Sequence, residues 1–349
     1  MVLEFTACAE IGQEPIMIDL HLHLDGSLSP EDVLQLAKLS GISLPREDAD
    51  GLRPLLEAEL DCQNLGEYLE KFDLPLQVLQ TEEAVSLSVY LLLKRLAAQD
   101  LCYAEIRFAP QLHTARGLTQ LQVVDAAVRG LREGIRDTGM PAQLILCCMR
   151  FDHNEEANRE TIRAAKAFLG RGVCAADLAG NEAANPTQWY APVFALADEL
   201  GVPFIIHAGE AAGPESIRQA LKLGALRIGH GVRAMEDPAL MAELAQKRIP
   251  LETCFTSNLQ TKAVSGAESY PFAAFLGMGI PATINTDNMT VSGTDLKQEY
   301  TLLQKQFGLS DEALLAAAWN AADAAFLPDS RKDELKATIK QAFTGWLHG

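Results

Sequence analysis

Short apolar runs rich in β-branched residues alternate along this chain with segments of helical periodicity, and each run ends in a polar or glycine cluster. Such runs indicate strands, which we expect at residues 16–24, 101–109, 143–149, 172–178, 202–208, 226–229, 249–253 and 280–285. Strands that alternate with helices pair in parallel through right-handed crossovers, and eight units close into a barrel. The sequence therefore predicts an α/β fold, a (β/α)8 TIM barrel forming one domain over residues 1–349.

The first predicted helix has recognisable ends, because Ser29 can cap it, Pro30 fits its first turn and Gly41 can stop it. Extra C-terminal helices are expected after the last strand, at residues 296–307, 311–325 and 332–346. An open doubly wound sheet is the alternative architecture. The barrel is preferred because the first strand runs into His-Leu-Asp-Gly and not into a glycine-rich dinucleotide turn.

A long insertion, residues 45–81, separates the first helical unit from the next. Apolar side chains recur in it at helical spacing, namely Leu65, Tyr68, Leu69, Phe72 and Leu76. We expect short helices that cover the barrel mouth as a lid. An ordinary packing hairpin is an equally weighted alternative.

Composition excludes several functions. With 29 Lys and Arg against 47 Asp and Glu, the formal net charge is −18, which repels a phosphate backbone or an anionic membrane surface. No apolar run approaches membrane-spanning length, and residues 1–15 contain no Lys or Arg that would begin a secretory signal. The seven cysteines lack CxxC spacing, which indicates reduced thiols. We expect a cytoplasmic protein that binds neither nucleic acid nor membrane, with its oligomeric state left open.

Polar side chains at the carboxyl ends of barrel strands point into one shared cavity. His21 and His23 stand two apart on the first strand and therefore face the same side, as a hydrogen-bonded pair or as metal ligands. His207 ends the fifth strand and Asp287 follows the eighth. Three imidazoles and one carboxylate make a shell for one divalent metal per chain, which we expect to be Zn²⁺, although iron and manganese stay open.

Two further side chains are candidates for acid-base chemistry. Glu210 lies three residues beyond His207, where its carboxyl can act as a general acid beside the metal. The alternative is a solvated loop glutamate. His230 ends the sixth strand between two glycines and can act as a base or electrostatic partner for water, or be a core histidine.

Three residues are candidates for substrate contacts. Gly180, after the fourth strand, can offer an unobstructed backbone N–H, although a tight turn explains a lone glycine as well. Asn288, beside Asp287, has both a donor and an acceptor for substrate. Asp25 can bind a hydroxyl group, and capping or turn formation is its alternative.

These motifs occur in an order that closely resembles the adenosine deaminase family of the amidohydrolase superfamily. The matching stretches span nearly the whole chain and lie at residues 18–27, 69–73, 104–108, 146–150, 177–180, 207–210, 227–231, 256–258 and 285–287. Each is a modest match alone, but the ordered set is highly specific. The architecture of nucleobase deaminases, which pairs HxE with PCxxC, is absent, because the chain contains no PCxxC.

The resemblance implies zinc-dependent hydrolysis of adenosine and 2′-deoxyadenosine to inosine or 2′-deoxyinosine and ammonia, in purine salvage. By position, zinc would be held by four residues, His21, His23, His207 and Asp287, of which Asp287 also counts as catalytic and His23 also faces substrate. Glu210 would protonate purine N1, and His230 would orient and deprotonate the attacking water.

The resemblance also assigns substrate contacts. Gly180 would bind N3 through its backbone, Asp25 would hold the ribose 5′-hydroxyl, and Phe72 corresponds to an apolar lid position. In departures from the family pattern, Asn288 and Met289 replace the usual Asp and Pro, and Phe255 replaces a common Pro. The usual Asp is thought to bond purine N7 when protonated. An Asn amide donates the same bond without a raised pKa, so we expect altered kinetics rather than lost chemistry.

Two alternatives stay open. The substrate could be free adenine or an adenine nucleoside with a modified ribose, although relatives that act on the free base resemble a pattern with Glu in place of Asp25. The chain could also be a nucleoside-binding protein that has lost catalysis, with Asn288 as its mark.

Overall fold

The computed structural model describes residues 17–59 and 62–347, with side chains described as far as residue 343. The predictions for residues 1–15 and Cys8 lie outside the described residues, as does the expected first strand residue Ile16. The strands are β1 (Met17–His23), β2 (Leu101–Phe108), β3 (Ala142–Met149), β4 (Val173–Ala179), β5 (Ile205–Ala208), β6 (Arg227–His230), β7 (Leu251–Thr253) and β8 (Ala282–Ile284). Each corresponds to a predicted strand.

The strands form two four-stranded parallel sheets, β1 to β4 and β5 to β8, in chain order. Single bridges join the sheets at two seams. At one seam, the N–H of Ala176 donates to the carbonyl of Pro203 at 2.9 Å. At the other, the N–H of Asp287 donates to the carbonyl of His21, and the N–H of His23 donates to the carbonyl of Asp287, both at 2.7 Å. The predicted (β/α)8 barrel is therefore confirmed.

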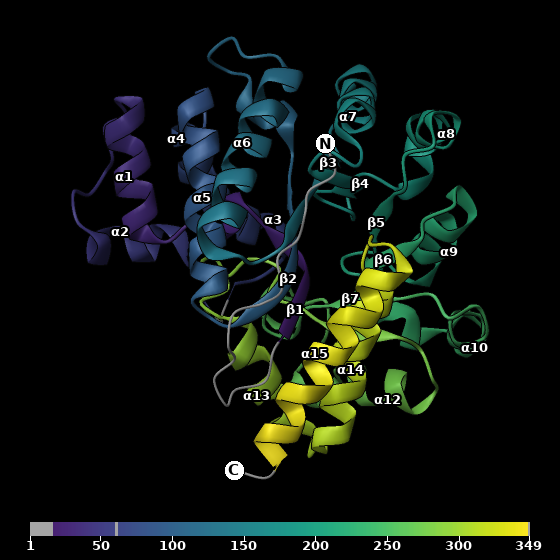
Figure 1. Ribbon diagram of the computed structural model, residues 1–349. Coiled ribbons are helices and arrows are strands. Elements are labelled where there is room, and N and C mark those ends of the chain that lie inside the picture. The colour runs from purple at the N-terminus through teal and green to yellow at the C-terminus, as the bar shows by residue number, and fades with distance from the viewer. Residues whose placement is uncertain (1–16, 60–61, 348–349) are drawn as a thin grey trace.

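Helices surround the strands (Figure 1). The α-helices are α1 (Pro30–Ser40), α2 (Ala49–Leu56), α3 (Leu65–Leu69), α4 (Asp73–Val78), α5 (Glu82–Ala97), α6 (Gln120–Thr138), α7 (Glu155–Phe168), α8 (Ala191–Leu200), α9 (Pro214–Leu223), α10 (Pro238–Lys247), α11 (Phe255–Gln260), α12 (Phe272–Gly277), α13 (Leu296–Phe307), α14 (Asp311–Ala324) and α15 (Asp329–Leu347). The 3-10 helices are η1 (Asp25–Ser27), η2 (Glu70–Phe72), η3 (Pro110–His113), η4 (Thr187–Tyr190), η5 (Val232–Glu236) and η6 (Ala267–Ser269). The three predicted C-terminal helices are present as α13, α14 and α15.

Helix α1 shows why the local sequence specifies these elements. The Ser29 hydroxyl accepts from the N–H of Asp32, and the Asp32 carboxylate accepts from the N–H of Ser29, which is a capping box. Gly41 ends the helix in the left-handed conformation, with φ 66°. Both predicted ends of the helix are therefore confirmed.

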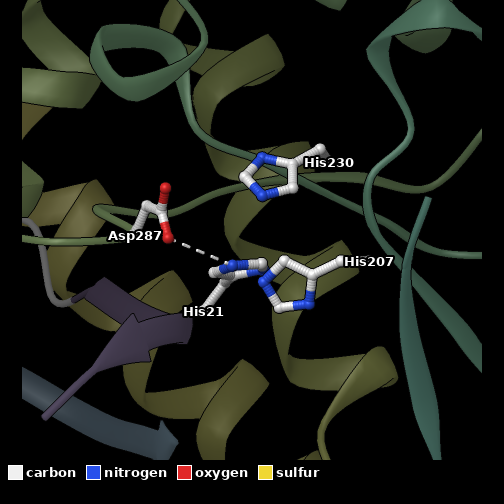
Figure 2. A group of neighbouring side chains, drawn as sticks. All are labelled: His21, His207, His230 and Asp287. Atoms are coloured by element: carbon white, nitrogen blue, oxygen red, sulfur yellow. Dashed lines mark ion pairs between the residues drawn. The ribbon is translucent and has the colours of Figure 1, made fainter. Parts of the chain in front are cut away.

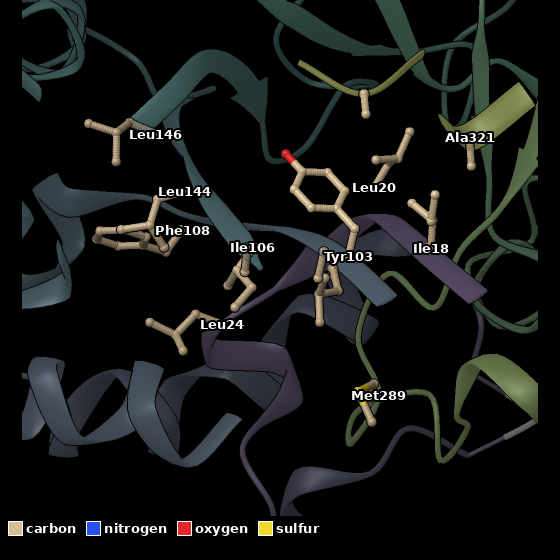
Figure 3. Close-up of a cluster of buried hydrophobic side chains, with 14 of the residues drawn as sticks. Ile18, Leu20, Leu24, Tyr103, Ile106, Phe108, Leu144, Leu146, Met289 and Ala321 are labelled. Atoms are coloured by element: carbon tan, nitrogen blue, oxygen red, sulfur yellow. The ribbon is translucent and has the colours of Figure 1, made fainter. Parts of the chain in front are cut away.

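The barrel wall is held by buried aliphatic side chains that alternate along each strand. On β1, Leu20, Leu22 and Leu24 are fully buried, as predicted for residues that face the helices. Figure 3 shows Leu20 and Ile18 near Tyr103 of β2. Burying one such side chain contributes about 1.5–3 kcal/mol, so the wall gives the strand ends a rigid frame.

The insertion forms the short helices α2, α3, η2 and α4, as predicted. Tyr68 is buried, and Phe72 and Leu76 line the main cavity of the barrel. We call residues 65–78 the cap. The alternative of an ordinary packing hairpin does not predict that these residues line a cavity.

Three strands begin more than one residue later than predicted, at Ile205, Leu251 and Ala282. In each case a proline (Pro203, Pro250 or Pro281) follows the expected first residue, and proline has no N–H to donate to a neighbouring strand. Helices α11 and α12 between β7 and β8 were not predicted. No helix within the described ranges combines the length and apolar character needed to cross a membrane.

Candidate active site

A cavity of about 480 Å³ lies at the carboxyl ends of the strands. This volume falls within the range typical of small-molecule sites. Of the predicted site residues, those that line it are His23, Asp25, Phe72, Gly180, His207, Glu210, His230, Asp287 and Asn288. His21 is fully buried directly beneath the other imidazoles, with its ring centroid 4.6 Å from that of His207. The structure therefore brings the predicted residues together.

The four predicted metal ligands place their side-chain nitrogen and oxygen atoms in a tight cluster. His23 Nε2 lies 3.3 Å from His207 Nε2, and Asp287 Oδ1 lies 3.3 Å from His21 Nε2 and 3.5 Å from His23 Nε2. Atoms that bind a tetrahedral cation at 2.0–2.1 Å lie about 3.3–3.4 Å from one another. Apart from this contact to Asp287, the buried His21 Nε2 has no polar partner among the described residues. The residues therefore fit one divalent metal ion.

His230 lies beside this cluster. One ligand atom from each of His21, His207, His230 and Asp287 lies within 4.8 Å of the others, and Figure 2 shows these side chains converging. We favour His23 over His230 as a ligand because its Nε2 lies 3.3 Å from His207 Nε2 and 3.5 Å from Asp287 Oδ1, the spacing expected of two ligands of one cation. His230 Nε2 instead lies 3.7 Å from Glu210 Oε2, so it faces the candidate acid.

Buried carboxylates orient two of the imidazoles from behind. Glu252 Oε2 lies 2.9 Å from His21 Nδ1, and Asp177 Oδ2 lies 3.0 Å from His207 Nδ1. Arg107 donates to both carboxylates, to Asp177 at 2.8 Å and to Glu252 at 2.7 Å. An Nδ1–H that donates to a carboxylate leaves the Nε2 lone pair free to face a cation.

Sequence reasoning missed these orienting residues. Arg107 and Asp177 lie in stretches that resemble the family, but nothing in their spacing indicated a role. Glu252 offered one usable signal, because it is an acidic residue inside an apolar strand and therefore needs a buried partner.

The protonation of the imidazoles suits metal binding. Burial lowers the pKa of His23, His207 and His230, so these rings are neutral at pH 7, as ligation requires. Burial also acts to lower the pKa of His21, but hydrogen bonds to Asp287 and Glu252 outweigh it and raise that pKa. At Asp287, burial is outweighed by the hydrogen bond to His21 and by nearby imidazoles, so its pKa falls.

Two carboxyl groups in the cavity have the opposite behaviour. Burial raises the pKa of Glu210 well above its ordinary value, and the nearby charges of Asp287 and Glu182 add to the effect. This shift favours the protonated form of Glu210, which can donate a proton. Burial also raises the pKa of Asp25, to about 6.

Backbone strain coincides with this site. Asp287 has φ 60° and His230 has φ 61°, in the left-handed region that non-glycine residues seldom adopt. Such a conformation costs about 1–3 kcal/mol and persists only where other contacts impose it. Here Ser257 Oγ donates to Asp287 Oδ2 at 2.5 Å, and the Asn258 amide lies 3.0 Å from His230 Nδ1.

The remaining candidate residues present groups toward the cavity. Gly180 has φ 105°, a conformation that requires glycine. A Cβ on Gly26 would lie 1.9 Å from Asn288 Oδ1, so the Asn288 side chain rests directly on that glycine. Asp25 Oδ1 and Asn288 Oδ1 are buried and have no hydrogen-bond partner within the described ranges. These two side chains therefore retain hydrogen-bonding capacity.

The family model of adenosine deaminase matches residues 17–342. The chain belongs to the adenosine deaminase family. An adenosine deaminase of Haemophilus ducreyi is 51% identical over 331 residues, which cover 94% of this chain and 96% of that protein. The predicted resemblance is therefore confirmed, and the chain is an enzyme of the adenosine deaminase family.

Solved structures related to this family agree with the fold. An adenine deaminase from Arthrobacter aurescens has a TM-score of 0.85 and 30% sequence identity, and covers 96% of this chain and 100% of its own. An N6-mAMP deaminase of Arabidopsis has a TM-score of 0.83 and 26% identity, and covers 94% of this chain and 98% of its own. The fold of the adenosine deaminase family thus accompanies several purine substrates.

Proposed function

We propose that this chain hydrolyses adenosine and 2′-deoxyadenosine to inosine or 2′-deoxyinosine and ammonia, and that it serves purine salvage in the cytoplasm. The observation that carries the proposal is the pairing of a buried carboxyl, Glu210, with a buried imidazole, His230, 3.7 Å away in the same cavity as the metal-binding cluster. Membership of the adenosine deaminase family supports the same reaction. The free, buried thiols among the described cysteines support a reducing compartment.

One Zn²⁺ would be held by His21, His23, His207 and Asp287, because imidazole nitrogens and carboxylate oxygens at these spacings are ligands that zinc favours. When bound, the cation supplies Lewis acidity that makes water nucleophilic at neutral pH. Glu252 and Asp177 would keep the imidazoles of His21 and His207 in the ligating orientation.

The protein's own groups move the protons. Glu210 donates a proton to purine N1, which makes C6 electrophilic, and His230 accepts a proton from the water whose oxygen bonds to C6. The C6–N bond of the amine then breaks and ammonia leaves. His230 gives the proton it took from water to the departing amine, and the hydroxyl proton on the C6 oxygen returns to Glu210 as the C6=O bond forms, so Glu210 and His230 return to their starting states.

Substrate would be held by residues around the cavity. The backbone N–H of Gly180 would bind N3, and Asp25, whose Oδ1 lacks a partner within the described ranges, would bind the ribose 5′-hydroxyl. Asn288 Oδ1 lies against Gly26, which leaves its Nδ2 to donate to N7. Phe72 would form part of an apolar wall. We propose that the cap opens and closes over this cavity, and that residues 1–349 form one domain.

Free adenine is the second candidate substrate, because the adenine deaminase from Arthrobacter aurescens has a TM-score of 0.85 against this chain. Asp25 distinguishes the two, since a ribose hydroxyl gives its unpartnered oxygen a donor and free adenine does not. A phosphate ester fits poorly, because acids line the cavity and Arg150 is the one Arg or Lys among the described residues that line it. Arg150 is buried against Asn185, Thr187 and His207.

The test is to mix purified protein with adenosine, 2′-deoxyadenosine, adenine or AMP and to follow ultraviolet absorbance, before and after chelation and after zinc is restored. The expected result is loss of adenosine and deoxyadenosine that stops on chelation and returns with zinc. Activity on adenine alone would reverse the sugar assignment. Activity on none of them would favour a nucleoside-binding protein that has lost catalysis.

A further inference from the structure

Four consecutive backbone N–H groups, those of residues 209–212, point at one buried carboxylate. We call this stretch the acid turn because it carries Glu210. Glu182 Oε1 accepts from the N–H of Gly209 at 2.8 Å. Glu182 Oε2 accepts from the N–H groups of Glu210, Ala211 and Ala212 at 3.0, 2.8 and 2.9 Å. Glu182 is 1% exposed, so water does not compete for these bonds.

The acid turn depends on this carboxylate because it belongs neither to β5, which ends at Ala208, nor to α9, which begins at Pro214. Successive N–H groups that face one point form an anion-binding concavity. Gly209 permits the shape, since its φ is 74° and a Cβ there would lie 2.4 Å from Ile217 Cδ1. The anion that fills the concavity comes from the chain itself.

The acid turn and its approach are also held through their carbonyl groups. The N–H of Gly231 donates to the carbonyl of Ala208, and the N–H of Arg233 donates to the carbonyl of Gly209, both at 3.0 Å. Residues 231 and 233 come soon after His230, the last residue of β6, whereas Glu182 lies two residues after Gly180, which follows the end of β4. The turn is therefore clamped between the loops that carry the candidate N3 contact and the candidate base.

Glu210 is itself a member of this turn, so the backbone conformation that Glu182 holds also sets the direction of the Glu210 side chain. While Glu182 fills the concavity, the Glu210 carboxyl faces the cavity, with Oε2 at 3.7 Å from His230 Nε2.

We propose that Glu182 is a positioning residue that occupies the acid turn and thereby keeps the Glu210 carboxyl directed at substrate. The inference rests on the proposed function for the role of Glu210, but the clamp itself can be tested without catalysis. Neither the motif spacing nor the resemblance had assigned Glu182 a role, although it lies two residues after Gly180.

The variant Glu182→Gln keeps the side-chain shape but turns an NH₂ group toward backbone donors. Hydrogen exchange of the peptide that covers residues 206–214 should show faster exchange of the amides of residues 209–212. With adenosine as substrate, kcat should fall about 100-fold while KM changes less than threefold, because ground-state binding does not need the proton. Glu182→Asp keeps the charge and should recover part of kcat.

Two controls separate positioning from folding. Asp237→Asn removes a carboxylate that also accepts backbone N–H groups, those of Ala239 and Leu240, but at the start of α10. It should leave kcat within twofold of the wild type. In a Glu210→Gln background, Glu182→Gln should cost less than a further threefold in kcat, because its effect acts through Glu210.

The outcomes are distinct. Unchanged exchange at residues 209–212, unchanged kcat in Glu182→Gln, or full additivity with Glu210→Gln would each overturn the positioning role. A wild-type protein that deaminates no adenosine would instead refute the proposed function. Altered exchange in Glu182→Gln would still show that the clamp exists in that case.

Discussion

The two walls of the cavity are built differently. We call the wall at the ends of β1, β5, β6 and β8 the metal wall. Its polar side chains are held in place by hydrogen bonds to other side chains, as His21 is by Glu252 and Asp287 is by Ser257. The cap offers mainly apolar side chains to the same cavity. One polar link between the cap and the metal wall is the 2.7 Å contact between the hydroxyls of Tyr68 and Ser292. The metal wall therefore holds its side chains in fixed positions where bonds are made and broken, whereas the cap provides adaptable apolar packing where substrate enters.

The carboxyl end of the cap is anchored through the two residues that follow it, Leu79 and Gln80. At its carboxyl end, His113 Nδ1 lies 3.0 Å from the carbonyl of Leu79, and Gln80 Nε2 donates to the carbonyl of Leu112 at 2.9 Å. Between the ends, Phe72 is only half-buried. Because the two walls differ in this way, changes in the metal wall should mainly alter kcat, and changes in the cap should mainly alter KM.

The largest effect is expected for Glu210→Gln on the metal wall. The amide has no acidic proton for N1, so kcat for adenosine should fall about 1,000-fold with little change in KM. Steady-state kinetics measure this, with the exposed Glu215→Gln as a control of equal charge change. A fall of less than tenfold would mean that another group supplies the proton.

Acid should weaken the anchor of the cap. Burial lowers the pKa of His113 to about 4, against 6.5 for the unperturbed ring. The unfolded chain therefore binds a proton first, and the free energy of unfolding should fall by about 3 kcal/mol as pH drops from 6.5 to 4. Denaturant titrations of wild type and His113→Gln measure the difference. Parallel pH curves for the two proteins would contradict the assignment.

The metal wall should respond in the opposite direction. Burial raises the pKa of Glu299 to about 7, and this carboxyl bonds Thr256 and Thr294 beside that wall. The folded chain retains the proton longer, so this group's contribution is complete below pH 4.5 and declines by about 3 kcal/mol as pH rises to 7. The gap in unfolding free energy between wild type and Glu299→Gln should narrow or reverse across that window. A gap that stays constant would refute the prediction.

Asp177→Asn should loosen His207 without touching the cavity. The loss of an orienting carboxylate typically lowers metal affinity about 10–100-fold. Competition with a chelator of known zinc affinity measures the change, and the exposed Asp125→Asn serves as the control. Unchanged zinc affinity would show that Arg107 and the barrel alone hold the ring.

The smallest effect is expected for Tyr68→Phe in the cap. Loss of the contact to Ser292 should cost about 1 kcal/mol, seen as an approximately fivefold rise in KM at nearly constant kcat. Tyr90→Phe removes an exposed hydroxyl bond to Asp137 and should change neither value. A fall in kcat without a change in KM would show that Tyr68 acts on the chemical step, as residues of the metal wall do, and would contradict the distinction between the two walls.

Local rules accounted for the parts of the molecule in which one residue determines one feature. The spacing of His21 and His23 placed both rings on one side of β1, and Ser29 and Gly41 bounded α1. The ligand set followed because parallel barrel strands end at the same rim. The early starts predicted for β5, β7 and β8 ignored prolines that cannot donate to the ladder.

Residues that act across the barrel could not be predicted in this way. Glu182 meets the acid turn 27 to 30 positions later in the chain, and Glu252 meets His21 across 231 positions. A glutamate carries the same local signal whether it is solvated or buried against four amides. Only the closed fold defines its partner, so the supporting residues appeared with the structure.

Asp287 links the seam between β1 and the end of β8 with the cation site. Its backbone exchanges hydrogen bonds with His21 and His23 while its carboxylate faces their rings. A cation shared by these three residues would act as a cross-link between β1 and the end of β8, the first and last strands of the barrel. Removing the cation should therefore loosen the closure of the barrel as well as stop the chemistry. The protection of β1 amides from hydrogen exchange should measure how strongly the first and last strands are joined.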